Sequence, residues 1–312
     1  MTSVAVANSD ANPTRTPGRP LSRRLDRLRF NPVSLLLLAP AAILLIALFI
    51  APICYAVYLG FTNLQLIGPR SARFSFTGMQ NVYTLLSDGV MLRSVWLTVV
   101  FVVGSGAIGT TALGLVIALA MRQGLPILQF VVSGLAIVAW TLPPTTIAII
   151  WYAATTHGGV IPTLLGMPNY DLLYDRAMLI VSFANSWSLA GLAMIMFSAA
   201  LRNLPTDIDE AAMLENASPT QRLVRLTLPL LKPTMVTSAL LMTLLSFANF
   251  TLIYLMTAGG PSNDTNILPV YSYLQGFKFY RLGYAALLGN VMVILSALIG
   301  AIFVFAGRSR RR

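Results

Sequence analysis

The stretch from Leu204 to Pro233, LPTDIDEAAMLENASPTQRLVRLTLPLLKP, is a charged island between two long apolar segments. Its acidic residues are Asp207, Asp209, Glu210 and Glu215, and its basic residues, counting the adjacent Arg202, are Arg202, Arg222, Arg225 and Lys232. Few other parts of the chain carry charge so densely. A chain that builds one surface with both signs of charge between apolar segments is expected to meet a partner there.

The composition around the island is typical of a membrane protein. Of 312 residues, 56% are hydrophobic and only 10% are charged, whereas a soluble domain has about 25% charged residues. A helix needs about 20 apolar residues to cross the hydrocarbon of a bilayer. Six segments are long enough: 33–60, 92–120, 126–153, 177–200, 234–257 and 282–306. Backbone groups in lipid must be satisfied within their own segment, so we expect an all-α fold with six transmembrane helices.

The distribution of basic residues predicts the orientation of these helices. Counted over both chain ends, the 121–125 turn and the island, one side of the membrane receives 15 of the 21 lysines and arginines. The positive-inside rule therefore places both termini and the island in the cytoplasm. Because the basic residues sit at membrane edges, the net charge of +11 indicates contact with membrane lipids and not binding of nucleic acid.

This pattern divides the chain into three parts. Residues 1–32, rich in Arg, Pro, Ser and Asn, are expected to be a disordered, basic cytoplasmic tail. Residues 33–307 hold the six helices, with two short helices of the island at about 206–228. Residues 308–312 form a second basic cytoplasmic tail.

The first short helix of the island is predicted from its end signals. Thr206 is a candidate N-cap, and Asp207 and Asp209 fall in the positive first turn. The helix is expected to run to about Glu215, where Asn216 can take the left-handed conformation that a turn needs.

The second short helix has a stronger start signal. Ser218 at the N-cap, Pro219 at the first position and Gln221 three residues after the cap form a capping box. We expect the helix to span 219–227 and to stop before Pro229. On these patterns alone, an amphipathic hairpin lying on the membrane surface is an alternative to a docking surface.

The island also resembles a known motif. The residues that carry the resemblance are Glu210-Ala211-Ala212, Glu215, Ala217, Leu226, Leu228-Pro229 and Pro233. Together they resemble the EAA signature of the permease subunits of binding-protein-dependent ABC importers. The family pattern has Gly where this chain has Asn216, a substitution that still accommodates a positive φ.

Three further motifs are similar to the carbohydrate-uptake branch of that family, which includes the maltose-type and glycerol-phosphate-type inner-membrane permeases. They are Phe76-x-Gly78-x-x-Asn81, Thr257-x-Gly259-Gly260-Pro261 and Gly283-Tyr284-Ala285-Ala286. Pro162 departs from the branch, which often has Asn there. With the EAA signature, the resemblance covers nearly everything after the basic tail.

The resemblance implies a transport subunit of the bacterial plasma (inner) membrane with several partners. A second permease subunit would complete the pathway, and an extracytoplasmic solute-binding protein or lipoprotein would deliver a sugar or sugar-like solute. A dimer of ATP-binding subunits would bind the ATP and Mg, so this chain would hold no cofactor and would not be an enzyme. The implied ATPase-coupling residues are Glu210, Ala211, Ala212, Glu215, Asn216 and Ala217.

Polar and aromatic residues inside the apolar segments are candidates for lining the solute pathway, because sugars need hydrogen-bond partners and an aromatic face in a mostly apolar cavity. These candidates are Trp140, Asn185, Ser188, Leu189, Leu192, Ser246 and Asn249. Hydrogen bonding between helices is the alternative role for an intramembrane Asn.

Other functions find little support. Gly104, Gly106 and Gly109 satisfy a G-x-G-x-x-G pattern, but they lie in an apolar segment with no preceding strand, so we expect them at a helix contact. His157 is the only histidine, and we expect no metal site and no catalytic residue. An ion-gradient-driven secondary transporter is the alternative function, although such proteins usually place ionisable residues at membrane depth.

Overall fold

The computed structural model describes residues 32–122 and 124–308. The tails predicted at 1–32 and 308–312 lie outside this part of the chain, except for Pro32 and Arg308, which are helical. The chain divides into two compact units, Met1–Cys54 and Tyr55–Arg312.

The described part of the first unit is a long apolar helix. It begins as α2 (Pro32–Leu45), passes through the π-helical segment η2 (Ile46–Ile50) and continues as α3 (Ala51–Gly60), whose last residues belong to the second unit. The 25 residues Leu36–Gly60 are long and apolar enough to cross a membrane. The first predicted segment is therefore a helix.

The second unit contains four further helices of sufficient length and one bent pair. The long helical stretches are α6 (Gly89–Phe101), η3 (Val102–Thr110) and α7 (Thr111–Arg122); α12 (Ala177–Arg202); α15 (Leu228–Ala248); and α18 (Leu282–Arg308). The bent pair consists of α8 (Pro126–Thr141) and a helical stretch from Pro144 to Leu164 that holds α9 (Pro144–Thr155) and α10 (Val160–Leu164). Over both units, the described residues thus hold five helices that could span a membrane, or six if the bent pair is one span.

Shorter helices connect these elements. They are α4 (Pro69–Ala72), α5 (Gln80–Ser87), α11 (Leu172–Asp175), α13 (Thr206–Leu214), α14 (Pro219–Arg222), η4 (Leu223–Thr227), α16 (Phe250–Thr257), α17 (Leu268–Tyr273) and η5 (Leu274–Lys278). The described residues form no strand beyond an isolated bridge between Thr62 and Phe76. The all-α prediction is thus confirmed for the described part of the chain.

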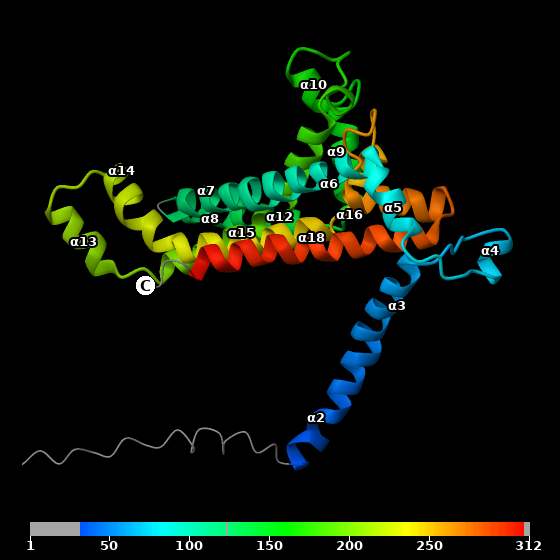
Figure 1. Cartoon of the computed structure of the whole chain (residues 1–312). Helices are drawn as coiled ribbons and strands as arrows, with labels where there is room; N and C mark the ends of the chain where they lie inside the picture. The colour runs from blue at the N-terminus through cyan, green and yellow to red at the C-terminus, as the bar shows by residue number, and fades with distance from the viewer. Residues whose placement is uncertain (1–31, 123, 309–312) are drawn as a thin grey trace, which may run out of the picture. The chain divides into compact units, whose positions relative to one another are not determined.

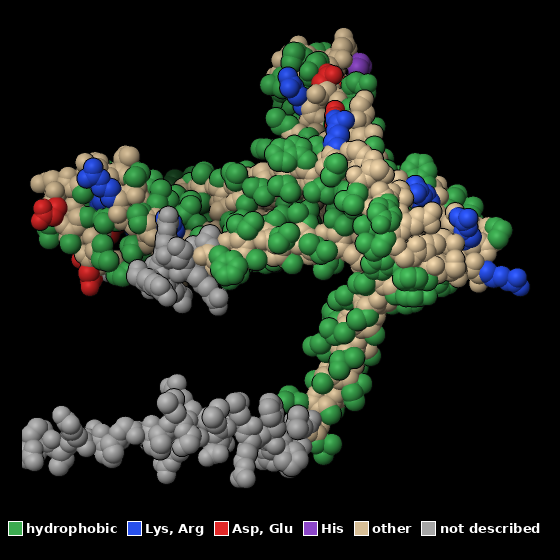
Figure 2. Space-filling view, in the orientation of Figure 1, with side chains coloured by type: hydrophobic (Ala, Val, Ile, Leu, Met, Phe, Trp, Pro, Cys, Tyr) green, Lys and Arg blue, Asp and Glu red, His purple; other side chains and the backbone are tan. Residues whose placement is uncertain are grey.

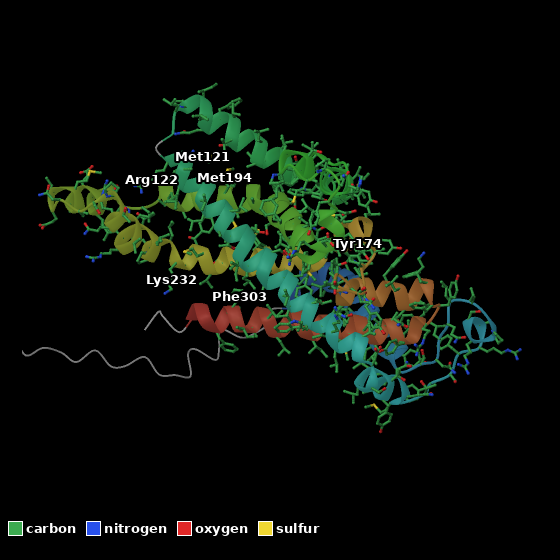
Figure 3. The ribbon with its side chains drawn as sticks, turned by 90° about the horizontal axis from the view of Figure 1, so that it is seen from above. Met121, Arg122, Tyr174, Met194, Lys232 and Phe303 are labelled. Carbon is green, nitrogen blue, oxygen red and sulfur yellow. The ribbon has the colours of Figure 1, made fainter. Side chains whose placement is uncertain are left out.

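The long helices of the second unit lie side by side in Figure 1, and Figure 3 shows that the stretch from α6 to α7 crosses α15 and α18 obliquely. The central helix is α12, which packs against α7, α8, η3 and α15, while α18 packs against α15. In the most apolar 18-residue stretch of α12, 61% is buried within the chain, whereas the share for α18 is 17%. Helix α12 therefore forms the middle of the bundle. The charged helices α13 and α14 lie at one end, and α4 and α5 lie at the other.

Small residues let the central helices approach closely. A Cβ added at Gly106 would lie 2.6 Å from the Ser246 Oγ, and one added at Gly109 would lie 2.4 Å from the Ser186 Oγ. Both distances are shorter than side chains can pack. Gly106 and Gly109 therefore lie at helix contacts, as predicted, while Gly104 has no neighbour within 4 Å of its Cβ position.

Prolines at two places in the sequence have different effects. Pro143-Pro144 breaks the third segment as predicted, because the pair separates α8 from α9 and the two helices are bent by 109°. The prediction that the second island helix stops before Pro229 is wrong. The chain is helical without interruption from Pro219 to Ala248.

A π-helical turn explains this continuity. In η4 the Leu228 N–H donates to the Leu223 carbonyl, five residues back. The wider turn places Pro229 in the first turn of α15, where its missing N–H and bulky ring are tolerated. The fifth segment, predicted at 234–257, therefore begins at the island, and it is broken at Asn249 between α15 and α16.

The contact of α8 with α12 is the closest glycine contact in the described chain and gives a test of the packing. A Cβ on Gly191 of α12 would lie 2.0 Å from the Ala136 carbonyl oxygen of α8. We predict that Gly191→Ala lowers the melting temperature of the purified protein by several degrees, because overpacking costs about 1–3 kcal/mol and backbone cannot move aside easily.

Gly134→Ala is the matched control for this test. Gly134 lies in α8, the helix that Gly191 contacts, and its Cβ position has no neighbour within 4 Å. Alanine favours an exposed helix by about 1 kcal/mol relative to glycine, so this variant should be as stable as the parent or more so. Equal melting temperatures for both variants would contradict the close contact.

Candidate functional site

The island folds into a helical hairpin made of α13, a short turn and α14. The turn forms where predicted, because Asn216 has a φ of 55° and the Ala217 N–H donates to the Ala212 carbonyl at 3.0 Å. The capping box is also present: the side chain of Ser218 accepts from the Gln221 N–H, and the Gln221 side chain accepts from the Ser218 N–H. We call Thr206–Arg222 the charged hairpin.

The predicted N-cap of the first helix is wrong by one residue. Thr206 is already the first residue of α13, and Pro205 occupies the N-cap position with a φ of −60° and a ψ of 123°. Proline suits a helix start because it has no N–H to leave unpaired and its φ is fixed near the helical value. Asp207 and Asp209 lie in the first turn, as predicted.

The charged hairpin presents most of the predicted coupling residues to its surroundings. Glu210, Ala211, Glu215 and Asn216 are exposed, and Ala212 and Ala217 are half-buried. The neighbouring Met213 and Leu214 are 52% and 86% exposed, respectively. Figure 2 shows the acidic side chains at this end of the second unit and hydrophobic side chains along its flank. The hairpin surface therefore combines acids, small residues and two large apolar side chains.

Asp209 fixes the charged hairpin to the bundle. Its Oδ1 accepts from Arg222 at 3.1 Å and its Oδ2 accepts from Arg122 at 3.2 Å. Arg122 ends α7, and Figure 3 shows it beside Met121 at the hairpin end of the bundle. From the sequence we expected only an interaction of Asp209 with the helix dipole, because Arg122 is 87 residues away along the chain.

A substitution at Asp209 tests this connection. We predict that Asp209→Asn loosens α13, because the change leaves Arg222, whose side chain is only 16% exposed, without its anion. Partly exposed ion pairs contribute up to about 1 kcal/mol each, so amide hydrogen exchange in 206–214 should quicken roughly fivefold. A double-mutant cycle with Arg222→Gln should show coupling between the two residues.

Glu215→Gln is the control for this experiment. Glu215 is an exposed acid of the same charged hairpin and forms no ion pair in the described chain. Exchange in 206–214 should stay at the parent rate in this variant. An equal increase in both variants would mean that total charge, and not the anchor, controls the hairpin.

A buried polar cluster lies in the middle of the bundle. Asn185 of α12 is fully buried, and its Nδ2 donates to the Ser105 Oγ and to the Ser246 Oγ, both at 2.8 Å. Its Oδ1 accepts from the Asn249 Nδ2, also at 2.8 Å. Three polar groups from η3, α15 and the break after α15 thus meet on one side chain.

The structure brings together three of the seven predicted pathway residues. Asn185, Ser246 and Asn249 meet in the cluster, and the Ser188 Oγ donates to the Asn185 backbone carbonyl. The hydrogen bonds of Asn185 match the alternative role of joining helices. The Asn249 Oδ1, by contrast, is buried and has no hydrogen-bond partner in the described chain.

The other pathway candidates lie elsewhere. Leu189 and Leu192 pack against a core cluster that contains Phe197. Trp140 is 38% exposed and lies against Gly191 at the contact between α8 and α12. A solute-lining role for these residues remains a prediction.

The end of the bundle opposite the hairpin holds a second polar network, centred on Asp88. The Asp88 Oδ2 accepts from the hydroxyls of Tyr271 and Tyr284, the latter at 2.7 Å. Its Oδ1 caps α6 by accepting from the N–H groups of Val90 and Met91. Composition and spacing gave no signal for this network, although Tyr284 belongs to one of the motifs behind the family resemblance.

The pKa values of this network follow from its geometry. Burial works against ionisation of Asp88, but the four hydrogen bonds outweigh it and hold the pKa of the carboxyl below its usual range. Burial and the adjacent Asp88 carboxylate raise the pKa of Tyr271 to about 12. Asp88 is therefore the charged acceptor of the network, and Tyr271 is a neutral donor.

The raised pKa of Tyr271 predicts a loss of stability at high pH. The folded chain holds the phenol proton more tightly than the unfolded chain, whose tyrosines titrate near pH 10. The stability that this proton adds to the folded chain is fully present below pH 10 and is lost as the pH rises towards 12. Melting temperatures measured from pH 8 to 12 should fall more steeply for the parent than for Tyr271→Phe.

Tyr83→Phe is the control for that measurement. Tyr83 lies in α5 and is 70% exposed. Its replacement should leave the steep fall of the parent unchanged. Parallel curves for the parent and Tyr271→Phe would show that the Tyr271 proton does not contribute to stability.

The other two motifs that resemble the carbohydrate-uptake branch also have structural roles. In the motif of Phe76 and Asn81, the Asn81 Nδ2 donates to the backbone carbonyls of Gly60 and Thr62, at 2.9 and 2.8 Å. In the loop that follows Thr257, the hydroxyls of Thr257 and Thr265 lie 2.6 Å apart. These contacts lie at the ends of α3 and α16. In the described chain no group of metal-ligating residues is found, and His157 has no such neighbours.

Comparison with known proteins gives the class of this chain. A model of the family described as the binding-protein-dependent transport system inner membrane component matches residues 110–312. The chain belongs to this family of multi-pass membrane proteins. The permease resemblance read from the EAA signature is therefore confirmed.

Two relatives agree with this assignment, and a solved structure has a similar fold. The trehalose transport system permease protein SugA of Mycobacterium tuberculosis is 30% identical over 97% of this chain and 95% of its own length. The sulfoquinovosyl glycerol transport system permease protein SmoG of Agrobacterium fabrum is 29% identical over 89% of this chain and 90% of its own. The fold is similar to that of a bacterial alginate ABC transporter in complex with an alginate pentasaccharide-bound periplasmic protein, with a TM-score of 0.70 at 18% identity, over 94% of this chain and 97% of that one.

Proposed function

We propose that this chain is one of two permease subunits of an ABC importer and forms half of the pathway for a sugar or sugar-like solute. The charged hairpin would dock into a separate ATP-binding subunit through Glu210, Ala211, Ala212, Glu215, Asn216 and Ala217. Family membership supports the transport role, and the exposure of these residues supports the docking. ATP and Mg would be bound by the partner ATPase and not by this chain.

The observation that carries the proposal is the unbroken helix behind the charged hairpin. The 30 residues Pro219–Ala248 form one helical rod, roughly 45 Å long at 1.5 Å per residue. One end of this rod is α14 of the hairpin, and the other end carries Ser246 of the buried polar cluster. A displacement of the hairpin by an ATPase would therefore move a residue that hydrogen-bonds to the central helix α12.

The anchor at Asp209 makes the charged hairpin a suitable lever. Because Asp209 pairs with both Arg122 and Arg222, a shift of α13 would pull on the ends of α7 and α14. Force applied to the exposed acids and alanines would thus reach three helices. Leu214, which is also exposed, would be buried by the partner.

We place the charged hairpin and both termini in the cytoplasm and count the bent pair α8–α9 as the sixth span, in a bacterial plasma membrane. The concentration of lysine and arginine on that side supports the orientation. A solute-binding protein would dock at the opposite end; the bacterial alginate ABC transporter is likewise in complex with an alginate pentasaccharide-bound periplasmic protein. A second permease subunit would complete the pathway.

The solute class follows from the relatives, whose names include trehalose and sulfoquinovosyl glycerol. Within the polar cluster, Asn249 fits a solute contact better than Asn185. The side-chain amide of Asn185 already donates and accepts hydrogen bonds between helices. The Asn249 Oδ1, by contrast, is buried and has no hydrogen-bond partner in the described chain. Asn249 also lies at the break between α15 and α16, where backbone can open towards a cavity.

Charge reversal at Glu210 tests the coupling. We predict that Glu210→Arg abolishes ATP-driven uptake of a radiolabelled sugar in cells while the protein level in membranes stays normal, because the docking surface would meet its partner with the wrong charge. Asp175→Arg, which reverses an acid of α11 in another loop, should keep most of the uptake. Normal uptake by Glu210→Arg would remove the proposed role of α13.

Crosslinking provides the direct form of this test. Cys54 is the only cysteine and is exposed, so Ala212→Cys should be made in a Cys54→Ala background. A crosslink from position 212 should capture the ATP-binding subunit. If uptake continues without any ATPase but stops with an uncoupler, the chain is an ion-gradient-driven secondary transporter instead.

A further inference from the structure

A groove runs between α8 and α12 at the hairpin end of the bundle. It consists of two overlapping cavities of about 500 and 450 Å³, which share Met121, Ser133, Ser198 and Arg202 in their walls. Figure 3 shows Met121, Arg122 and Met194 near this end of the bundle. None of the residues assigned to the solute pathway lines either cavity.

The chemistry of the groove changes along its length. Besides the four shared residues, the second cavity of the groove is lined by Ile137, Met194, Ile195, Ala199 and one polar residue, Asn203. Ile137 and Ile195 are exposed, so this mainly apolar half lies at the surface of the bundle. The half at the charged hairpin is lined by polar and charged residues: Arg122, Gln129, Ser133, Ser198, Arg202, Asp209 and Glu210. An apolar cavity that opens into a charged one matches an amphiphile with an apolar chain and a charged head.

Two groups in the charged half are available to a ligand. Arg202 is exposed and forms no ion pair within residues 32–122 and 124–308, unlike Arg122, which Asp209 already holds. The Ser198 Oγ, one helical turn away, is buried and has no hydrogen-bond partner in the same part of the chain. A cation beside a free hydroxyl is a suitable site for a phosphate oxygen.

The groove does not lead to the centre of the bundle. At the position where α12 carries Gly191, a Cβ would lie 2.0 Å from the Ala136 carbonyl oxygen of α8, so the two helices touch beyond the apolar half. The flank of α8 is covered by exposed hydrophobic side chains such as Leu128, Leu135 and Val138. The apolar half is therefore closed inwards and is bordered by a surface suited to lipid.

We propose that the groove binds a glycerophospholipid, with an acyl chain between α8 and α12 and its phosphate at Arg202. This inference rests on the proposed orientation, because a lipid of the cytoplasmic leaflet has its phosphate at the cytoplasmic end of the helices. The charged half is also lined by Glu210 and Met213 of α13. A bound lipid would therefore contact the charged hairpin and support it from the membrane side.

Photolabelling of the whole transporter tests the site. The purified complex is reconstituted into vesicles that contain a phosphatidylethanolamine or a phosphatidylglycerol with a diazirine in one acyl chain, illuminated and digested. Label should concentrate on peptides of α8 and of 194–202 in α12. Arg202→Gln should reduce this labelling roughly tenfold, because it removes a charge-assisted hydrogen bond to phosphate.

Two further variants make the result specific. Ile195→Trp fills the apolar half of the groove and should reduce the labelling without any change of charge. Arg225→Gln removes an exposed arginine of η4 that lines neither cavity, and labelling should stay at the parent level. Comparing the two probes shows whether the ethanolamine or the glycerol headgroup is preferred; preferential labelling of the groove by either one supports the site.

Three outcomes would overturn the proposal. Labelling could be equal in the parent, Arg202→Gln and Ile195→Trp, or it could spread evenly over α18, whose Ile302 and Phe305 are also exposed. A photoreactive sugar could label the groove in place of the lipid, which would make it a solute exit. The readout uses neither uptake nor ATP hydrolysis, so failure of the lipid site and failure of the proposed coupling are distinguishable.

Discussion

Pro229 and Pro233 lie in the helix that joins the charged hairpin to the middle of the bundle, and a helix can pass a proline only if the backbone makes room for its ring. The π-helical turn at Leu223–Thr227 provides this room at Pro229. The proposed coupling depends on the resulting rod, because a chain that ended its helix at Pro229 would leave the hairpin on a flexible link. The same rod carries Ser246 into the buried polar cluster.

Two kinds of contact keep the rod in place. At the hairpin, Asp209 joins the ends of α7 and α14 by ion pairs. In the middle of the bundle, Asn185 joins η3, α15 and the break at Asn249 by hydrogen bonds. Between helices in a membrane, hydrophobic packing discriminates poorly against lipid, so hydrogen bonds and close glycine contacts supply the specificity. Gly106 and Gly109 allow this approach.

Much of the charged hairpin could be predicted from local sequence. The left-handed Asn216, the capping box of Ser218 and Gln221 and the acids in the first turn all depend on residues within a few positions of each other. Two predictions were wrong: Thr206 is the first residue of α13 and not its N-cap, and the second helix continues through Pro229. Each outcome depends on how the backbone relaxes around a proline. The partner of Asp209 is 87 residues distant, and nothing in the pattern pairs them.

By itself the sequence determined that the chain is helical and apolar, that Pro143-Pro144 breaks one segment, and that the chain belongs to the permease family. These properties follow from composition, spacing and a motif, all of which are local. Tertiary structure decided that Asn185 hydrogen-bonds to residues of η3 and α15, that Asp88 accepts from two tyrosine hydroxyls and that a groove lies between α8 and α12. Each of these depends on the distance between residues of different helices, which is set only when the bundle packs.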